Sequence, residues 1–152
     1  SLWGGGVRVD NQTQEPGDID SVVIRECTIV SNTAENGGGI AVGRAKAHLT
    51  RNEIVSNTIT DGGGAGLLVS DGVVTVTNTV IAWNRGDESW NGDGVSIWNT
   101  GTDVHVINST IVSNTAEGVD AIAGSVDVRN TIIYGNNGGI QNYQSGATIT
   151  SD

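Results

Sequence analysis

Asn108-Ser109-Thr110-Ile111-Val112-Ser113-Asn114 is the stretch that decides the fold, because versions of it occur five times in the chain. The other copies are ECTIVSN from position 26, RNEIVSN from 51, NTVIAWN from 78 and NTIIYGN from 130. Every copy ends in Asn, and Ile stands three residues before it: Ile29, Ile54, Ile81, Ile111 and Ile133 with Asn32, Asn57, Asn84, Asn114 and Asn136. Successive Asn residues are 25, 27, 30 and 22 positions apart. A repeat of roughly 20 to 50 residues predicts a solenoid, a propeller or an array.

Two further segments precede this phrase in each repeat, and both alternate between apolar and polar residues. The nearer segment is VVI at 22–24, AHL at 47–49, VTV at 74–76, VHV at 104–106, VDV at 126–128 and ATI at 147–149. Its last apolar residue stands five positions before the repeated Ile, which leaves room only for a tight bend. The farther segment usually opens with Gly: GVRV at 6–9, GIAV at 39–42, GLLV at 66–69, GVSI at 94–97, GVDA at 118–121 and GIQN at 139–142. A period of two predicts β-strands, three in each repeat.

Three short strands in 21–33 residues cannot bury a core alone, so the repeats are expected to stack. Stacking at about 4.8 Å per coil pairs each strand in parallel with its copies and lines one narrow interior with apolar columns. The repeated Asn residues would form a hydrogen-bonded amide ladder at one bend, with Asn78, Asn108 and Asn130 as a shorter second column. We therefore predict an all-β, single-stranded parallel β-helix of five to six coils, formed by residues 1–152 as one domain.

Other repeat architectures fit the pattern less well. A leucine-rich solenoid needs a Leu-rich consensus and a helical or 3₁₀ segment, neither of which is present. A hexapeptide solenoid would have sides of equal length, whereas one turn of this repeat varies freely in length. A propeller needs four-stranded blades of about 40 residues, which these shorter units cannot supply.

The amino-acid composition argues against some classes of binding partner. The formal net charge is −10, with 7 Lys and Arg against 17 Asp and Glu, which argues against nucleic acid and anionic membrane surfaces. No apolar run is long enough to span a membrane. The single cysteine, Cys27, cannot form a disulfide within the chain and is expected to be a small residue beside the bend. Its column is otherwise occupied by Asn52, Thr79, Ser109 and Thr131.

The segment GGGI at 37–40, the V-x-V-x-N strands and the phrase T-I-V-S-N-T-A carry a resemblance to a known group. The chain resembles right-handed parallel β-helix proteins of the pectate-lyase-like superfamily, especially secreted bacterial surface proteins similar to adhesins and polymorphic outer-membrane proteins. Its last coil, from position 130 onward, is similar to the β-helix region that precedes anchoring domains in such proteins. The resemblance implies a right-handed helix and an extracellular or cell-surface location. It implies no single activity, because the superfamily contains lyases, hydrolases, epimerases, adhesins and phage tailspikes.

The turn after the repeated Asn varies most in length and is longest at 84–94. Loops on a rigid scaffold often carry function. Four interpretations of the 83–98 region stay open: sugar binding by Trp faces and polar groups, calcium binding, the tripeptide Arg-Gly-Asp as a receptor ligand, or a polar loop capped by aromatic side chains. The candidate ligand-binding residues are Trp83, Arg85, Asp87, Glu88, Trp90, Asp93 and Trp98. The candidate calcium ligands among them are Asp87, Glu88 and Asp93.

Catalysis has weaker support. Asp93 in NGDGVSI resembles the NTDG element of polygalacturonase-like hydrolases, which use paired acids. The remaining elements of that pattern, an Asp-Asp pair, His-Gly and Arg-x-Lys, do not follow it. His48 and His105 occupy the same outward position two coils apart, about 9.6 Å, which is too far to share a metal ion. We assign no catalytic residue and expect no cofactor, with calcium as the open alternative.

The sequence therefore favours a non-enzymatic structural or adhesive module of a secreted or cell-surface bacterial protein. The alternative is a carbohydrate-binding or polysaccharide-cleaving module that acts through the 83–98 region. The Gly-led and middle strands occur six times and the Ile–Asn strand five times, so exposed strand edges are expected at the ends. Expected partners are copies of the module stacked end to end in a fibre, the rest of a longer chain, and surface glycans.

Overall fold

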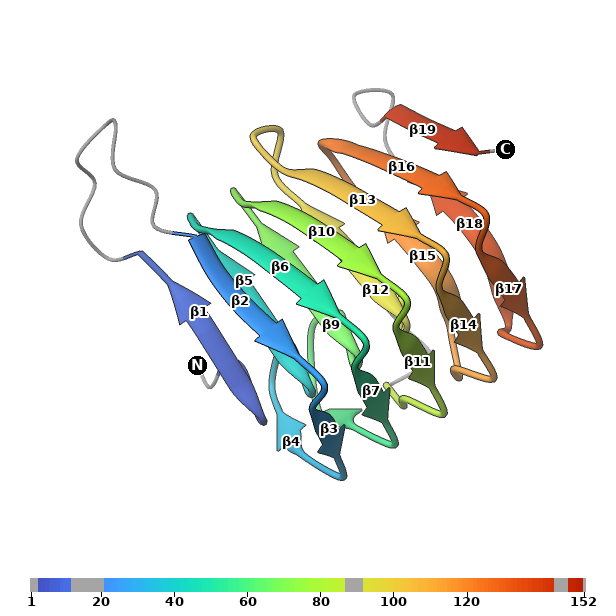
Figure 1. The fold of residues 1–152 in the computed structure, drawn as a ribbon. Helices are drawn as coiled ribbons and strands as arrows, with labels where there is room; N and C mark the ends of the chain where they lie inside the picture. Colours follow the sequence, from blue (N-terminus) through green and yellow to red (C-terminus); the bar gives the residue numbers. More distant parts are fainter. Residues whose placement is uncertain (1–2, 12–20, 87–91, 144–147, 152) are drawn as a thin grey trace.

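The computed structural model describes residues 3–11, 21–86, 92–143 and 148–151. All regular elements in these residues are β-strands, and they wind into a solenoid in which three parallel sheets run along the whole length (Figure 1). Each of the first five coils contributes one strand to each sheet, and the last contributes one strand to each of the first two. The predicted all-β parallel β-helix with three strands per coil is therefore confirmed.

The first sheet contains the Gly-led strands and has six members. Its register aligns the first apolar residue of each strand, as Val7 with Ile40 and Leu67 with Val95. The strands in order are β1 (Val7–Asp10), β5 (Ile40–Gly43), β9 (Leu67–Ser70), β12 (Val95–Trp98), β15 (Glu117–Ala121) and β18 (Gly138–Asn142).

The second sheet also has six strands and lies opposite the first across the interior. Val74 pairs with Ala47 on one side and with Val104 on the other, so the alternating residues keep one face throughout. The strands in order are β2 (Ser21–Arg25), β6 (Lys46–Thr50), β10 (Val73–Thr77), β13 (Asp103–Ile107), β16 (Ser125–Arg129) and β19 (Thr148–Ser151).

The third sheet holds the repeated Ile residues and has five strands. A tight bend joins it to the second sheet, and one residue of each bend has a positive φ, such as Arg51 (54°) and Asn108 (51°). This left-handed conformation suits Asn better than most side chains. It explains why the spacing from the second strand to the repeated Ile does not vary. The strands in order are β3 (Thr28–Val30), β7 (Glu53–Val55), β11 (Val80–Ala82), β14 (Thr110–Val112) and β17 (Ile132–Tyr134).

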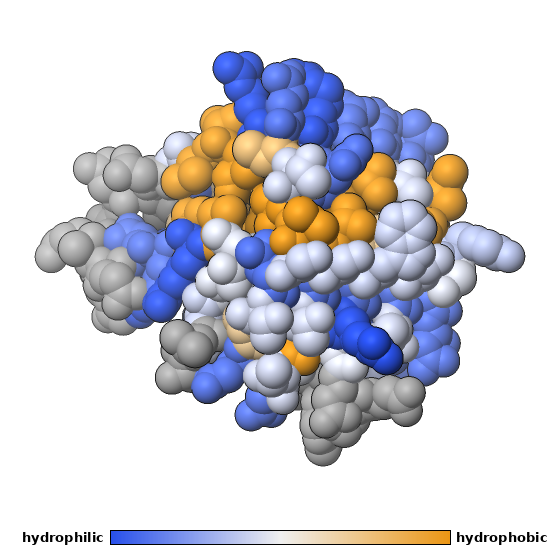
Figure 2. Space-filling view, turned by 90° about the horizontal axis from the view of Figure 1, so that it is seen from below, coloured by the Kyte–Doolittle hydropathy of each residue, from blue (hydrophilic) through white to orange (hydrophobic). Residues whose placement is uncertain are grey.

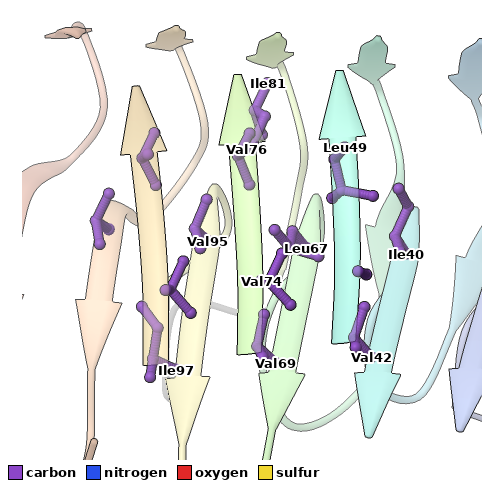
Figure 3. Packing of buried hydrophobic residues seen from close by; sticks show 14 of the residues in the cluster. Ile40, Val42, Leu49, Leu67, Val69, Val74, Val76, Ile81, Val95 and Ile97 are labelled. Atoms are coloured by element: carbon purple, nitrogen blue, oxygen red, sulfur yellow. The ribbon is translucent and has the colours of Figure 1, made fainter. Parts of the chain in front are cut away.

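Apolar columns from all three sheets fill the interior, two from each of the first and second sheets and the repeated Ile residues from the third (Figure 3). In the central coils these side chains are fully buried: Ile54, Ile81 and Ile111 have no exposed area. In the end coils the equivalent residues are only partly buried: Val7, Val9 and Val22 at one end, and Ile133, Ile140 and Ile149 at the other. The interior is therefore closed in the middle of the solenoid and accessible at its ends.

The amide ladder is present where the third sheet ends. The backbone N–H and the Nδ2 group of Asn57 donate to Oδ1 of Asn84, at 2.9 and 3.1 Å. The same Nδ2 group donates to the carbonyl of Ile29 in the preceding coil at 2.9 Å. This pattern continues through all five repeats and links Asn32, Asn57, Asn84, Asn114 and Asn136 in one direction. In the second column, Nδ2 of Asn130 donates to Oδ1 of Asn108 at 2.6 Å.

Two features differ from the expectations. A short fourth sheet pairs β4 (Thr33–Ala34) with β8 (Thr58–Ile59) in the turns before the Gly-led strands. Cys27 is exposed rather than covered, because it lies in the first coil and the described residues provide no coil before it. The equivalent residues of the following coils, Asn52, Thr79 and Ser109, are buried.

Candidate functional site

The 83–98 region joins β11 to β12, and the structure describes four of its seven candidate residues. Trp83, Arg85, Asp93 and Trp98 can be placed. Asp87, Glu88 and Trp90 lie outside the described residues. The receptor-ligand tripeptide and the calcium interpretation both depend on these residues, so both remain predictions.

Trp83 and Arg85 both point away from the core. Trp83 follows β11 with a φ of 53°, and 61% of its area is exposed. Asn84, between the two, turns inward to the amide ladder. The main chain of Arg85 pairs with the preceding coil: its N–H donates to the carbonyl of Asn57 at 2.8 Å, and its carbonyl accepts from Ile59 at 2.9 Å. The two exposed side chains are thus held on an ordered backbone.

Asp93 is buried, with 1% of its area exposed. Its Oδ2 atom accepts a hydrogen bond from the hydroxyl of Thr115, whereas Oδ1 has no hydrogen-bond partner. Burial raises the pKa of this carboxyl, and the bond from Thr115 opposes the rise. A Cβ atom added at Gly86 would lie 2.1 Å from Oδ1, so the neighbouring backbone covers this oxygen closely. This carboxylate has the environment of a structural group.

Trp98 covers part of the outer face of the first sheet. Its Nε1–H donates to the hydroxyl oxygen of Ser96 at 2.9 Å, and Ser96 donates to Oδ2 of Asp120 at 3.2 Å. The indole also meets the ring of Trp3 edge to face, with centroids 5.9 Å apart. Trp98 is therefore packed and hydrogen-bonded within the module.

Asp120 is fully buried at the end of this chain of hydrogen bonds, and sequence reasoning missed it. Oδ2 also accepts from the N–H of Gly92 at 3.1 Å, and Oδ1 has no partner. Burial raises the pKa of this carboxyl to about 6, although both hydrogen bonds favour the ionised form. The side chain occupies the outward position of its strand and is nevertheless buried.

Glu117 and Tyr143 form a second contact near the buried acids. The hydroxyl of Tyr143 donates to Oε1 of Glu117 at 2.7 Å, and this bond, with burial, raises the tyrosine pKa to about 12. The charge of Glu117 contributes to the raised pKa values of Asp93 and Asp120. These acids face protein groups rather than an open cleft.

The part of the chain that the structure describes contains neither a cluster of metal-ligating side chains nor a helix that could cross a membrane. No group of three or more His, Cys, Asp or Glu side chains there could hold a metal ion. His105 lies between Asp103 and Asp127, at 3.3 and 3.4 Å, so it has carboxylate neighbours and is not simply solvated. No helix in these residues is long and apolar enough to cross a membrane.

Exposed apolar side chains concentrate on the third sheet. Val30 and Ile132 expose 50% and 62% of their area, and Tyr134 exposes 77%. Figure 2 shows hydrophobic residues gathered in a band on one face of the molecule. Trp83 lies at the end of the same sheet, two coils from Tyr134. The N–H of Trp83 donates to the carbonyl of Val112, and Val112 pairs in register with Tyr134.

Three continuous parallel sheets, one closed interior and a directional amide ladder define this protein as a parallel β-solenoid. The model of a protein family described as "Right handed beta helix region" matches residues 3–152. The chain belongs to this right-handed β-helix family, which confirms the fold and handedness implied by the resemblance. Comparison with curated proteins and with solved structures found no match.

Proposed function

We propose that this chain is a non-enzymatic structural module, a rigid β-helical shaft of a secreted or cell-surface bacterial protein. The observation that supports the proposal best is the continuity of its interior. Among the described residues, the same apolar columns run through successive coils, and the same amide ladder links all five repeats. A stack of this kind is stiff along its axis because each coil is bonded to the next in all three sheets.

The buried acids support a structural role over a catalytic one. An acid that transfers a proton to a substrate must come within hydrogen-bonding reach of it. Asp93 and Asp120 are 1% and 0% exposed, and their neighbours are Thr115, Ser96 and backbone groups. Rearrangement of the covering loops would be needed before either carboxyl could contact a polysaccharide.

The ends of the solenoid support extension by stacking. At one end an open hollow of about 460 Å³ is lined by Val7, Val9, Val22 and Ile24. At the other end Ile140 and Ile149 are only partly covered. Unpaired strand edges next to accessible apolar side chains favour the addition of further strands. We propose that coils of a longer chain or of a second copy cover these ends.

Negative-stain microscopy combined with light scattering tests the stacking. We expect thin filaments, or a mass that rises with protein concentration. Compact particles of constant monomer mass at every concentration would contradict stacking between copies.

Carbohydrate binding is the second candidate, and the exposed aromatic pair favours it. Trp83 and Tyr134 lie two coils apart, about 9.6 Å, and present rings on which sugars could stack. We expect Trp83→Ala and Tyr134→Ala to abolish binding to any polysaccharide that retards the chain in affinity electrophoresis. Val30→Ser, which changes another exposed residue of the sheet, should leave binding intact. Unchanged retardation in both aromatic variants would exclude this surface.

A further inference from the structure

Asn108 lies on the exposed bend between β13 and β14 and begins the tripeptide Asn108-Ser109-Thr110. An Asn with Ser or Thr two positions later is the acceptor pattern for attaching a sugar to the Asn side chain. The chain contains this pattern twice, and the other copy, which begins at Asn11, extends outside the described residues. Asn108 has a φ of 51°, and its side chain is exposed. A bulky group attached there would remain outside the core.

The carboxamide of Asn108 has an engaged oxygen and a free nitrogen. Its Oδ1 atom accepts a hydrogen bond from Nδ2 of Asn130 at 2.6 Å, which fixes the orientation of the group. Within the described residues, Nδ2 of Asn108 donates to no acceptor. Asn130 occupies the equivalent position of the next coil, but its Nδ2 atom is already engaged in this bond. A sugar on Nδ2 of Asn108 therefore costs the fold no hydrogen bond.

A surface hollow of about 420 Å³ adjoins this side chain. Residues 108–110 line it from one coil and residues 130–132 from the next, so the hollow lies on the flank of the solenoid. Its lining is mixed: Ile132 exposes 62% of its area, and Asn130 and Thr110 carry polar groups. Such a lining suits a hexose, which presents carbon-bound hydrogens on its ring faces and hydroxyl groups around its rim. An exposed acceptor nitrogen and a hollow thus occur side by side.

We propose that Asn108 is a glycosylation site, which receives one hexose from a nucleotide-activated sugar, and that the attached ring occupies the adjoining hollow. Nδ2 attacks C1 of the sugar, the bond from C1 to the phosphate oxygen breaks, and the nucleoside diphosphate leaves. One Nδ2 proton passes to a base of the transferring enzyme, so the step needs no oxidant or reductant. The inference rests on the proposed secreted or cell-surface location, because this modification is typical of secreted proteins.

Enzymatic glycosylation of the folded chain provides the first test. The chain carries Asn11→Gln, which leaves Asn108 as the single acceptor pattern. It is incubated with UDP-glucose and a soluble N-glycosyltransferase that modifies the peptide NSTIVSNT, residues 108–115 of this protein. We expect intact-mass spectrometry to show one added hexose and peptide fragmentation to place it on Asn108. A folded chain that stays unmodified while the peptide is modified would overturn the proposal.

Variants of the tripeptide show whether the acceptor pattern directs the reaction. Asn108→Gln removes the acceptor, and Thr110→Val removes the hydroxyl that the pattern requires. We expect neither variant to gain a hexose, whereas Thr110→Ser, which keeps a hydroxyl, should still gain one. A hexose added to Thr110→Val as fast as to the unmodified tripeptide would overturn the proposal.

The next coil offers a matched control for the orientation of the carboxamide. Ile132→Thr creates a second acceptor pattern that begins at Asn130, at the same position of the bend. We expect Asn130 to be modified about tenfold more slowly than Asn108, because its Nδ2 atom must first release the hydrogen bond to Asn108. Equal rates at the two residues would show that the tripeptide alone decides, and would overturn the role assigned to the free nitrogen.

Nuclear Overhauser contacts locate the attached sugar. In the glycosylated chain we expect contacts from the hexose ring protons to the methyl groups of Ile132, because this side chain lines the hollow. A hexose on Asn108 without such contacts would overturn the assignment of the hollow to the sugar.

The glycosylation site and the proposed structural role can fail separately. Filaments formed by a chain that the enzyme does not modify at Asn108 would keep the structural proposal and contradict this inference. Modification at Asn108 in a chain that stays monomeric at every concentration would keep this inference and contradict stacking between copies.

Discussion

The interior of the solenoid and the outer layer on its first sheet are both buried, but they are built differently. Inside, each position repeats in every coil: Ile54, Ile81 and Ile111 stack in one column. On the outer face of the first sheet the stacked residues all differ and are all buried: Ala41, Leu68, Ser96 and Asp120. An interior residue packs on copies of itself, whereas an outer residue packs beneath the turn that covers it. Stacking therefore enforces uniformity inside and allows variation outside.

The largest effect is expected in the interior. Ile81→Ala removes a fully buried side chain and leaves a cavity between Ile54 and Ile111, both held in register. We expect a loss of about 2–5 kcal/mol in the free energy of unfolding, measured by denaturant titration. Ile132→Ala on the same sheet, where the side chain is 62% exposed, is the control and should cost much less. Similar losses of unfolding free energy in the two variants would contradict the distinction between interior and exposed positions of this sheet.

The amide ladder lies at the boundary of the two regions, and its removal should have the next largest effect. Asn84→Ala leaves the backbone N–H of Asn57, one of its two Nδ2 protons and the carbonyl of Ile54 without partners in a buried place. We expect a loss of about 2–4 kcal/mol, because unsatisfied buried polar groups are costly. Amide hydrogen exchange at Asn57 should accelerate in the variant. Unchanged exchange there would show that the ladder does not hold the coils together.

The interior and the ladder could be predicted from the sequence because each coil repeats the same residue types, with a fixed spacing between the repeated Ile and the repeated Asn. The outer layer could not, because its burial depends on turns that differ in length. A signal was nevertheless present: Gly37 and Gly64 each stand four residues before an outward residue that is buried. A Cβ atom at Gly64 would lie 2.8 Å from the Cβ of Leu68, so the backbone folds directly over that side chain. Asp93 was noticed for its acid group, but its burial beneath such a turn was not foreseen.

Asp120 makes the outer layer sensitive to pH. Its pKa is raised to about 6 in the folded chain, so the folded state holds this proton more tightly than the unfolded state does. Stability is therefore highest below the unfolded pKa and falls as pH rises from about 4 to 6, by up to about 3 kcal/mol. In Asp120→Asn this part of the fall should disappear. Urea titrations at intervals between pH 4 and 7 measure this fall in the free energy of unfolding. Parallel pH profiles for the unmodified chain and Asp120→Asn would contradict the assignment of the fall to Asp120.

The pKa of Asp10 shifts in the opposite direction to that of Asp120, so the two acids affect stability in different pH ranges. Asp10 is partly buried, but its ion pairs with Arg8 and Arg44 outweigh burial and lower its pKa. Its stabilising effect is lost only as pH falls below about 4. Burial raises the pKa of Asp93, as it does that of Asp120. Asp93→Asn should therefore remove a further part of the fall in stability that accompanies rising pH.

Leu68→Ala gives the most direct comparison with Ile81→Ala, and its effect should be the smallest. Both side chains are fully buried, but Leu68 lies outside the main core cluster, beneath a turn that contains Gly62 and Gly64. The cost of a large-to-small change depends on how far its surroundings can collapse, and a turn can move closer more easily than a paired strand can. We expect a loss of about 2 kcal/mol in the free energy of unfolding. A loss equal to that of Ile81→Ala would mean that the covering turns are as rigid as the stacked strands, and the outer layer would then be a second core.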